Sequence, residues 1–528
     1  MVSEQTRLRV KAAVVAGRRA RRAWSRWLWK AWPKALRGPF EVVDSFDVWA
    51  YRAELAHSVS NLLDRHGVEH LLLDRPPMAI PELIVDKAEA KRVLRILRTD
   101  EQARRWWLAP SHLGPIGVPT PARMIGRPLW GVTGVMVSRN LVTADGLSLT
   151  NSEDGALIQF WTRLASDVAS KGGGTQPSGS LVAPYSNGVL DVVDPPLWQQ
   201  IQQDGHVLSG LLDHLMTVTE PVDVVYTWVD GQDPAWQARK AAAFKQVTGH
   251  LPHDAATQAR FESRDELRYS LRSLEMYANW INHIWIVTDQ QRPDWLHEDE
   301  RLTVVDHREI FADTATLPVF NSHAIESQLH HIPGLAERYL YFNDDMLLAS
   351  PVRPEAFFHG NRIHRFFVSP ALIDVGGHDR ADHAVTSAAK NNRSFVEREF
   401  GAAITNKLRH TPQASSRSLM EEFEARHPEM FADLTRSRFR RPTDHALTSS
   451  LAQYYGYVNQ RAVPGVIANG YVDLVSPHAE FQLEQWLRNR DRACICINDS
   501  GADAAHVDGF LHRFFENYYP LPSRWEKR

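Results

Sequence analysis

The sequence of 528 residues has little cysteine, only Cys494 and Cys496. Two cysteines this close together do not build a disulfide framework, and a zinc site would need further soft ligands, so we expect two half-buried strand residues. Sparse cysteine fits the reducing cytoplasm. The chain also lacks an apolar run near the ~20 residues that span a bilayer. We therefore expect a cytoplasmic protein without a transmembrane helix.

An excess of one charge is also missing. The 60 Lys and Arg residues face 63 Asp and Glu residues, which gives a formal net charge of -3. This balance argues against a nucleic-acid partner for the protein as a whole. The length allows two or three domains with cores of their own.

Residues 1–40 form a basic, tryptophan-rich extension, with eleven Lys or Arg against one acid and with Trp24, Trp27, Trp29 and Trp32. The apolar stretch within it is too short for a secretory signal. A helix of this composition, over residues 1–38, would lie on an anionic membrane surface at the inner face of the plasma membrane. The alternative is a solvated basic extension, and both interpretations stay open.

Three units are expected after this extension. Residues 41–170 predict a small α/β accessory domain without a catalytic motif. Residues 171–220 are expected to be a linker, because they begin with a run rich in Gly, Ser and Pro. Residues 221–528 predict a mostly parallel sheet with helical additions, because strands alternate with helical patterns. The strands of this last domain are expected at 222–229, 283–288, 302–305 and 336–342.

Acidic residues follow the last of these strands. Asn343, Asp344 and Asp345 come directly after a run of aromatic and aliphatic residues. Open α/β folds bind ligands at the carboxyl edge of the sheet. Clustered carboxylates there suit Mg²⁺, Mn²⁺ or Ca²⁺ and, through the metal, a diphosphate. The alternative is an ordinary turn or helix cap, where acids are common.

The first strand carries Asp223 at its start and Asp230 at its end. Asp230 and Gly231 make a normal turn pair, and Asp223 could cap the strand. Two buried strands that each release acids suggest a sheet that gathers carboxylates at one edge.

Two further features have the chemistry of a phosphate site. Arg440 and Arg441 precede a predicted helix, where forked guanidinium donors and the helix end both suit phosphate. The alternative is a salt-bridged surface turn. His410 is one of 24 histidines, most of which are expected to be structural.

Longer motifs occur in order, and their sequences are DVVYTWVDG (223–231), RFESRDELRYSLRSLEMYANWINHIWIVTDQQRPDWL (260–296), HAIESQLHHIPGLAERYLYFNDDMLL (323–348), FRRPTDHAL (439–447), CICINDS (494–500) and ENYYPLPSRWE (516–526). Together they resemble the Stealth family of capsular and exopolysaccharide sugar-phosphate transferases, in an actinobacterial type of member. The catalytic subunit of N-acetylglucosamine-1-phosphotransferase belongs to the same family. The resembling regions are 221–232, 260–348, 406–460 and 494–526.

The resemblance implies a Rossmann-like nucleotide-diphosphosugar transferase core. It also implies transfer of sugar-1-phosphate from a UDP-N-acetylhexosamine or UDP-hexose to a hydroxyl of a polysaccharide acceptor, with Mg²⁺ or Mn²⁺, or Ca²⁺, as cofactor. Release of the nucleoside monophosphate would distinguish this reaction from the alternative, an ordinary metal-dependent glycosyltransferase. A non-catalytic glycan-binding scaffold is the second alternative, and a homo-oligomer stays open.

The resemblance also implies a set of site residues. They are the catalytic residues Asp223, His410 and Arg441, with Arg440 as its alternative; the donor-binding residues Arg264, Glu266, Ser322, Glu326, His330 and Asn343; and the metal ligands Asp344, Asp345, Asn498 and Asp499. Among these, His410 is the candidate general base, since neutral imidazole suits this task near pH 7. Arg264 has an alternative role in ion pairs on a helix face.

Overall fold

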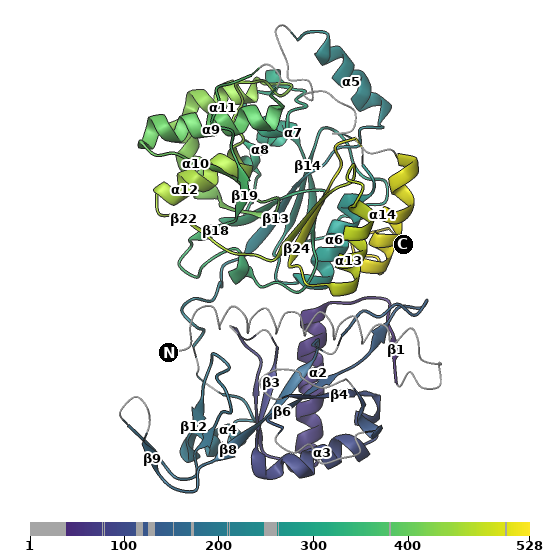
Figure 1. Cartoon of the computed structure of the whole chain (residues 1–528), viewed down its shortest axis with the longest axis vertical. Helices are drawn as coiled ribbons and strands as arrows, with labels where there is room; N and C mark the ends of the chain where they lie inside the picture. Colours follow the sequence, from purple (N-terminus) through teal and green to yellow (C-terminus); the bar gives the residue numbers. More distant parts are fainter. Residues whose placement is uncertain are drawn as a thin grey trace. The chain divides into compact units, whose positions relative to one another are not determined.

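The computed structural model describes residues 39–76, 78, 80–111, 120–124, 132–151, 153–169, 174–208, 210, 212–247, 261, 263–379, 382–501 and 504–527. Residues 1–38, and with them the expected membrane contact, lie outside the described residues. The chain divides between Thr217 and Val218 into two compact units (Figure 1). Among the described residues, no helix combines the length and the apolar character that crossing a membrane requires.

The first unit is built on an eight-stranded sheet. Its strands are β12 (Val192–Val193), β11 (Leu181–Val182), β8 (Ala156–Arg163), β6 (Gly134–Ser138), β4 (Trp107–Ser111) and β5 (Thr120–Pro121), with β3 (Glu82–Asp86) between β8 and β2 (His70–Leu73). Helices α2 (Val48–Arg65), α3 (Ala90–Thr99) and α4 (Pro195–Gln203) accompany it.

The segment expected to be a linker takes part in the core of this unit. Strands β11 and β12 pair with the main sheet, and Trp198 and Ile201 of α4 are buried in the same hydrophobic cluster as Trp161. Residues 181–203 are therefore folded against the accessory sheet. The Gly- and Pro-rich composition marks short turns between these elements.

The second unit has a central sheet with the order β15 (Leu302–Asp306), β14 (Ile284–Thr288), β13 (Val222–Thr227), β16 (Arg338–Asn343) and β21 (Gln413–Ser416). The first four strands are parallel, and β21 is antiparallel to β16. Strands buried on both faces require nearly continuous apolar runs, which β13 and β16 have. The predicted α/β fold with a mostly parallel sheet is confirmed.

The strand order reverses between β13 and β16. After β13 the chain adds β14 and β15 on one side, and it then returns to place β16 on the other side. Counted from β13, this is the order 3-2-1-4 of a Rossmann half-sheet, in which ligands bind at the carboxyl ends of the two strands flanking the reversal.

A second, three-stranded sheet meets the first at this edge. It has the order β17 (Met346–Leu348), β24 (Cys494–Asn498) and β23 (Asn469–Asp473). Only Asp344 and Asp345 separate the end of β16 from the start of β17. The chain therefore passes from one sheet to the other through two acidic residues.

Helices lie on both sides of the central sheet (Figure 1). On one side are α6 (Glu266–Tyr277), α13 (Ala479–Asn489) and α14 (Ala504–Tyr518); on the other are α9 (Ala384–Phe400), α10 (Arg417–Arg426), α11 (Pro428–Thr435) and α12 (Ala452–Val458). Ser270 and Ser273 of α6 bond the main chain of β17, at Met346 and Leu348. The start of α6 is thereby fixed beside the acidic turn.

Candidate functional site

Three carboxylates gather where the two sheets join. Asp344 and Asp345 are half-buried in the turn after β16, and Glu266 is buried at the first position of α6. Burial and the charge of Asp345 raise the pKa of Asp344 to about 7. Burial and the charge of Asp344 raise the pKa of Glu266 to about 8. Burial raises the pKa of Asp345 to about 7, the hydrogen bond from Cys496 opposes this shift, and the charge of Glu266 adds to it. The charge of each acid thus raises the pKa of another, and a bound cation would stabilise the charged form of all three.

The main chain fixes these acids from several elements. Ile497 of β24 donates its N–H to the carbonyl of Asp345 at 3.0 Å. The N–H of Arg264 donates to Glu266 Oε2 at 2.6 Å. Asp265 has a φ of 67°, in the left-handed region, directly before α6. This unusual backbone turns the chain so that Glu266 enters the helix facing the acidic turn.

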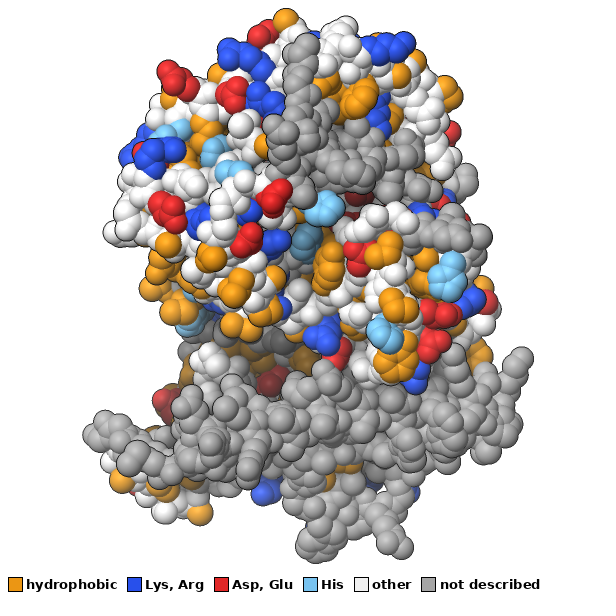
Figure 2. Space-filling model, turned by 45° about the horizontal axis from the view of Figure 1, so that its top comes forward, with side chains coloured by type: hydrophobic (Ala, Val, Ile, Leu, Met, Phe, Trp, Pro, Cys, Tyr) orange, Lys and Arg blue, Asp and Glu red, His pale blue; other side chains and the backbone are white. Residues whose placement is uncertain are grey.

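The carboxyl groups have the chemistry that a hard divalent cation prefers. Carboxylate oxygens are the ligands that Mg²⁺, Mn²⁺ and Ca²⁺ prefer. Among the described residues, Asp345 Oδ1 is buried and has no hydrogen-bond partner. A buried carboxylate oxygen without a partner costs free energy, which a bound cation would recover. On the face drawn in Figure 2, acidic side chains and histidines of the second unit lie close to one another.

The three carboxylates form one wall of the site. A second wall comes from α8 (Ser322–Glu326) and the segment around Arg440. Glu326 is buried and accepts hydrogen bonds from the N–H of Ser449 at 3.1 Å and from its Oγ at 3.0 Å. Burial raises the pKa of Glu326 to about 7, while the charge of Arg440 opposes the shift. Arg440 Nη2 donates to Ser322 Oγ at 2.6 Å. This wall therefore presents a guanidinium group that donates to a hydroxyl group and interacts electrostatically with a buried carboxyl group.

Tyr341 of β16 connects the two walls. Its hydroxyl bonds Thr227 Oγ1 at 3.0 Å, at the end of β13. Burial raises the pKa of Tyr341, the charges of Glu326 and Asp344 add to the shift, and Arg440 opposes it. Tyr341 thus interacts electrostatically with acids of both walls and with Arg440. The two walls therefore lie around the reversal of strand order. Asn343, the last residue of β16, is half-buried at the same edge, in register with Thr227.

The two adjacent arginines, Arg440 and Arg441, have different partners. Arg441 Nη2 donates to Asp433 Oδ2 at 2.9 Å, and its Nε donates to Asp444 Oδ1 at 3.2 Å. Asp444 is buried, so this pair is part of the packing. These ion pairs favour Arg440, the predicted alternative to Arg441, as the arginine that faces the site.

Asp223 does not belong to this site, which corrects its predicted catalytic role. It is the second residue of β13 and pairs with Tyr339, whereas Thr227 pairs with Asn343 at the opposite end of the strands. It is fully buried, and it accepts hydrogen bonds from three groups, namely Asn282 Nδ2 at 2.8 Å, Trp285 Nε1 at 2.9 Å and Ala336 N at 2.9 Å. A carboxylate with three donors at the amino end of the sheet holds the strand starts together.

Asn498 and Asp499, predicted as metal ligands, have other partners. Arg264 Nε and Nη2 donate to Asp499 Oδ2 at 3.1 and 3.0 Å. Asn498 Nδ2 donates to Asp473 Oδ2 at 2.9 Å. The guanidinium group neutralises the Asp499 charge that a cation would need. Arg264 itself, predicted to contact the donor, ties Asp499, which follows β24, to the segment that precedes α6.

The ring of Tyr471 lies between His410 and the strand that contacts the acidic turn. Its ring centroid is 5.1 Å from that of Tyr471, and Tyr471 is the strand partner of Cys496. Enclosure by the protein and then the charge of Lys407 lower the pKa of His410, while its side chain keeps solvent contact. The ring is therefore neutral near pH 7 and able to accept a proton.

His330, predicted in the donor pocket, is buried elsewhere. His330 Nε2 and His331 Nε2 each lie 2.8 Å from Glu424 Oε2. The backbone carbonyl of Ile310 accepts from His331 Nδ1 at 3.1 Å, so this nitrogen carries a hydrogen. His331 Nε2 must then also be protonated to face a carboxylate. The group is an ion pair that anchors α10, and the predicted donor contact of His330 is corrected.

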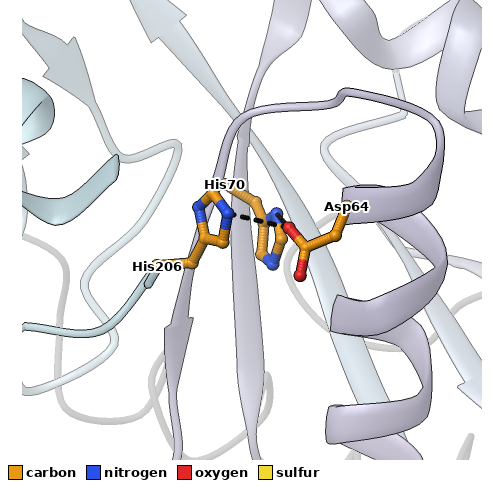
Figure 3. A group of neighbouring side chains, drawn as sticks. All are labelled: Asp64, His70 and His206. Carbon is orange, nitrogen blue, oxygen red and sulfur yellow. Dashed lines mark ion pairs between the residues drawn. The ribbon is translucent and has the colours of Figure 1, made fainter. Parts of the chain in front are cut away.

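A second group of histidines and a carboxylate occurs in the first unit (Figure 3). His206 Nε2 lies 2.8 Å from Asp64 Oδ1 and stacks on His70 with ring centroids 4.3 Å apart. Both ring nitrogens of His70 are already engaged, Nδ1 with the carbonyl of Val68 at 3.0 Å and Nε2 with Ser60 Oγ at 2.6 Å. His70 has no nitrogen left for a metal, so the group is a hydrogen-bonded structural cluster.

Comparison with known proteins agrees with the resemblance seen in the motifs. Models of Stealth protein conserved regions 1, 2, 3 and 4 match residues 220–246, 260–366, 409–457 and 485–528. The chain is 50% identical over 312 residues to the exopolysaccharide phosphotransferase SCO6023 of Streptomyces coelicolor. It is 36% identical over 484 residues to SCO2592 of the same organism, and 39% identical over 325 residues to the exopolysaccharide phosphotransferase CpsY of Mycobacterium tuberculosis.

These matches cover parts of longer proteins. They include 58%, 89% and 61% of this chain, and 53%, 50% and 61% of SCO6023, SCO2592 and CpsY. The chain therefore spans about half the length of the relatives it matches. A solved galactosyltransferase, LgtC with donor and acceptor sugar analogues, is 10% identical with a TM-score of 0.30, covering 57% of this chain and 96% of that chain, and this likeness is too weak to carry an argument.

Replacing Asp223 by Ala is expected to destabilise the fold. Three donors would lose the buried carboxylate that accepts from them, and a donor left without a partner costs roughly 1–3 kcal/mol where it is buried. Thermal and urea unfolding of Asp223→Ala and of Asp230→Ala, a control at the other end of the strand, measure this cost. A variant at Asp223 with unchanged stability and abolished turnover would return Asp223 to the catalytic residues.

The ion pair of Glu424 predicts a pH dependence of stability. The hydrogen bond that His331 donates to Glu424 raises the pKa of His331. The contribution of this pair to stability is therefore full below the ordinary value of about 6.5 and is lost as pH rises through the raised pKa. Burial would raise the pKa of Glu424, but the hydrogen bonds of His330 and His331 outweigh it and lower the pKa to about 2. The carboxylate therefore stays charged throughout the range of interest.

The melting temperature is thus expected to fall between pH 6 and pH 9 by more in the native protein than in His331→Gln. The difference corresponds to ~1 kcal/mol or less for a partly exposed pair. Equal pH slopes for the two proteins would show that His331 is neutral.

Proposed function

We propose that this chain, a member of the Stealth family, transfers sugar-1-phosphate from a nucleotide-diphosphate sugar to a hydroxyl of a polysaccharide acceptor in exopolysaccharide synthesis. The donor we propose is a UDP-N-acetylhexosamine or a UDP-hexose. The observation that carries the proposal is the group of Glu266, Asp344 and Asp345, each with a raised pKa, at the reversal of strand order.

These three carboxylates would hold one divalent cation, Mg²⁺ or Mn²⁺, with Ca²⁺ as an alternative. A bound cation would neutralise the diphosphate and make the attacked phosphorus more electrophilic. Glu266 was expected in the donor pocket, and its electrostatic interaction with Asp344 and Asp345 favours a place in the metal site. Its raised pKa means that proton loss accompanies metal binding.

The opposite wall supplies the positive charge of the protein. We assign to Arg440 the stabilisation of the charge that develops on the transferred phosphate, because its guanidinium group is held by Ser322 near Glu326. A fixed guanidinium stabilises such charge without reorganisation during the reaction. Asn343 has an amide at the strand end, suited to orient the donor.

Proton transfer is assigned to His410. The acceptor oxygen attacks the phosphorus that carries the sugar, and its proton passes to the neutral imidazole. The bond between this phosphorus and the bridging oxygen breaks, and the nucleoside monophosphate leaves with that oxygen. The lowered pKa of His410 keeps a lone pair available at neutral pH. Tyr471, packed against His410, would line the acceptor side.

The leaving nucleotide tests this reaction. Incubation with a panel of nucleotide sugars and Mg²⁺ or Mn²⁺, followed by mass spectrometry, is expected to detect a nucleoside monophosphate and a sugar phosphodiester. Asp344→Asn and Asp345→Asn are expected to lower turnover by ~10²-fold or more, the usual range for a lost electrostatic contact. Asp230→Asn serves as a matched control.

A nucleoside diphosphate as the product would instead establish ordinary glycosyl transfer. Absence of nucleotide binding with every metal and sugar would favour a glycan-binding scaffold.

The two neighbouring arginines are expected to respond differently. Arg440→Gln should lower kcat by ~10²-fold with little change in melting temperature, because it acts on the transferred phosphate. Arg441→Gln should lower the melting temperature, because it leaves Asp444 buried with a weakened partner set. Kinetics and thermal unfolding of both variants separate the roles, and the reverse pattern would restore Arg441 to the site.

A further inference from the structure

Cys496 touches the acidic turn without a role in the chemistry described so far. It is fully buried on β24, in register with Met346 on β17 and with Tyr471 on β23. Its Sγ donates a hydrogen bond to Asp345 Oδ2 at 3.3 Å. The next residue, Ile497, donates its N–H to the carbonyl of Asp345 at 3.0 Å. Consecutive residues of one strand therefore hold both the side chain and the main chain of Asp345.

The thiol makes the two oxygens of this carboxylate unequal. Oδ2 is bound to Cys496, whereas Oδ1 is buried and has no hydrogen-bond partner among the described residues. Rotation of the carboxylate would give up the thiol contact. The thiol thereby fixes the orientation of the carboxylate and, with it, the direction of Oδ1. A metal ligand whose orientation is fixed before binding is preorganised.

The chemistry of the donor suits this task. A thiol is a weak, uncharged donor, so it orients a carboxylate while leaving its negative charge available. The nearby Asp499 is the contrasting case, because Arg264 makes two bonds to its Oδ2, at 3.1 and 3.0 Å. A guanidinium group cancels the charge that attracts a cation, and a thiol preserves it.

We propose that Cys496 is a positioning residue, whose S–H group fixes Asp345 Oδ2 so that Oδ1 is directed at a divalent cation. The inference rests on the proposed function, in which Asp345 is a metal ligand. It assigns a task to the thiol that burial and packing alone would not require.

Cys494 is a matched control in the same strand. It is also fully buried and lies two residues earlier on the same face of β24, in register with Leu348 instead of Met346. Truncation of either cysteine removes a buried sulfur atom from the same face of β24. Only truncation of Cys496 removes a hydrogen bond to Asp345.

The test uses the full chain and Mn²⁺ alone, at one pH. Free Mn²⁺ is followed by its electron paramagnetic resonance signal during titration of the native protein, Cys496→Ala, Cys496→Ser, Cys494→Ala and Asp345→Asn. Thermal unfolding of each variant is measured beside it. Loss of binding in Asp345→Asn locates the ion at the acidic turn.

Cys496→Ala is expected to weaken Mn²⁺ binding ~10-fold, the lower end of the range for residues that orient metal ligands. Cys496→Ser should restore most of the affinity, since a hydroxyl also donates, and Cys494→Ala should bind as the native protein does. Unchanged affinity in Cys496→Ala, or equal weakening in Cys494→Ala or Cys496→Ser, would refute the positioning role. If the native protein binds no Mn²⁺, the proposed metal site fails and this inference fails with it.

Discussion

The burial of three carboxylates, together with their mutual repulsion, is the constraint on which the site depends. Asp344 and Asp345 lie where the chain leaves one sheet for another, and Glu266 begins the helix beside them. Water and basic side chains do little to relieve this charge, as the raised pKa values indicate. The surrounding structure must therefore hold the acids together against their repulsion, and the bonds from β24 and from the main chain before α6 do this.

The fold distributes its other acids differently. Asp223 has three donors, Asp499 has the guanidinium of Arg264, and Glu424 has two histidines. These paired acids tie strand starts, loop ends and helices to one another. A charge that is already paired has little affinity left for a ligand. Glu266, Asp344 and Asp345 have no cationic side-chain donor among the described residues, so they are the acids available for a cation.

The arrangement also explains why neighbours in sequence have different tasks. Arg440 and Arg441 are adjacent, yet one bonds Ser322 on the wall of the site and the other bonds Asp433 and the buried Asp444. Cys494 and Cys496 differ in the same way, since only the second donates to a carboxylate. Where two sheets and a helix meet, residues one or two positions apart in the sequence have different hydrogen-bond partners.

The sequence by itself determined the features that are local in the chain. Apolar runs predicted the strands and their parallel pairing, the motif order predicted the family, and acids after an apolar run predicted a charged strand end at Asp344 and Asp345. Only the tertiary structure decided which other groups join them. Parallel pairing sends Asp223 to the opposite end of the sheet, and β24 brings Cys496 to Asp345 across 151 residues of sequence. Contacts at such separation depend on the order in which strands pair, and a side-chain pattern with a period of two residues carries no record of that order.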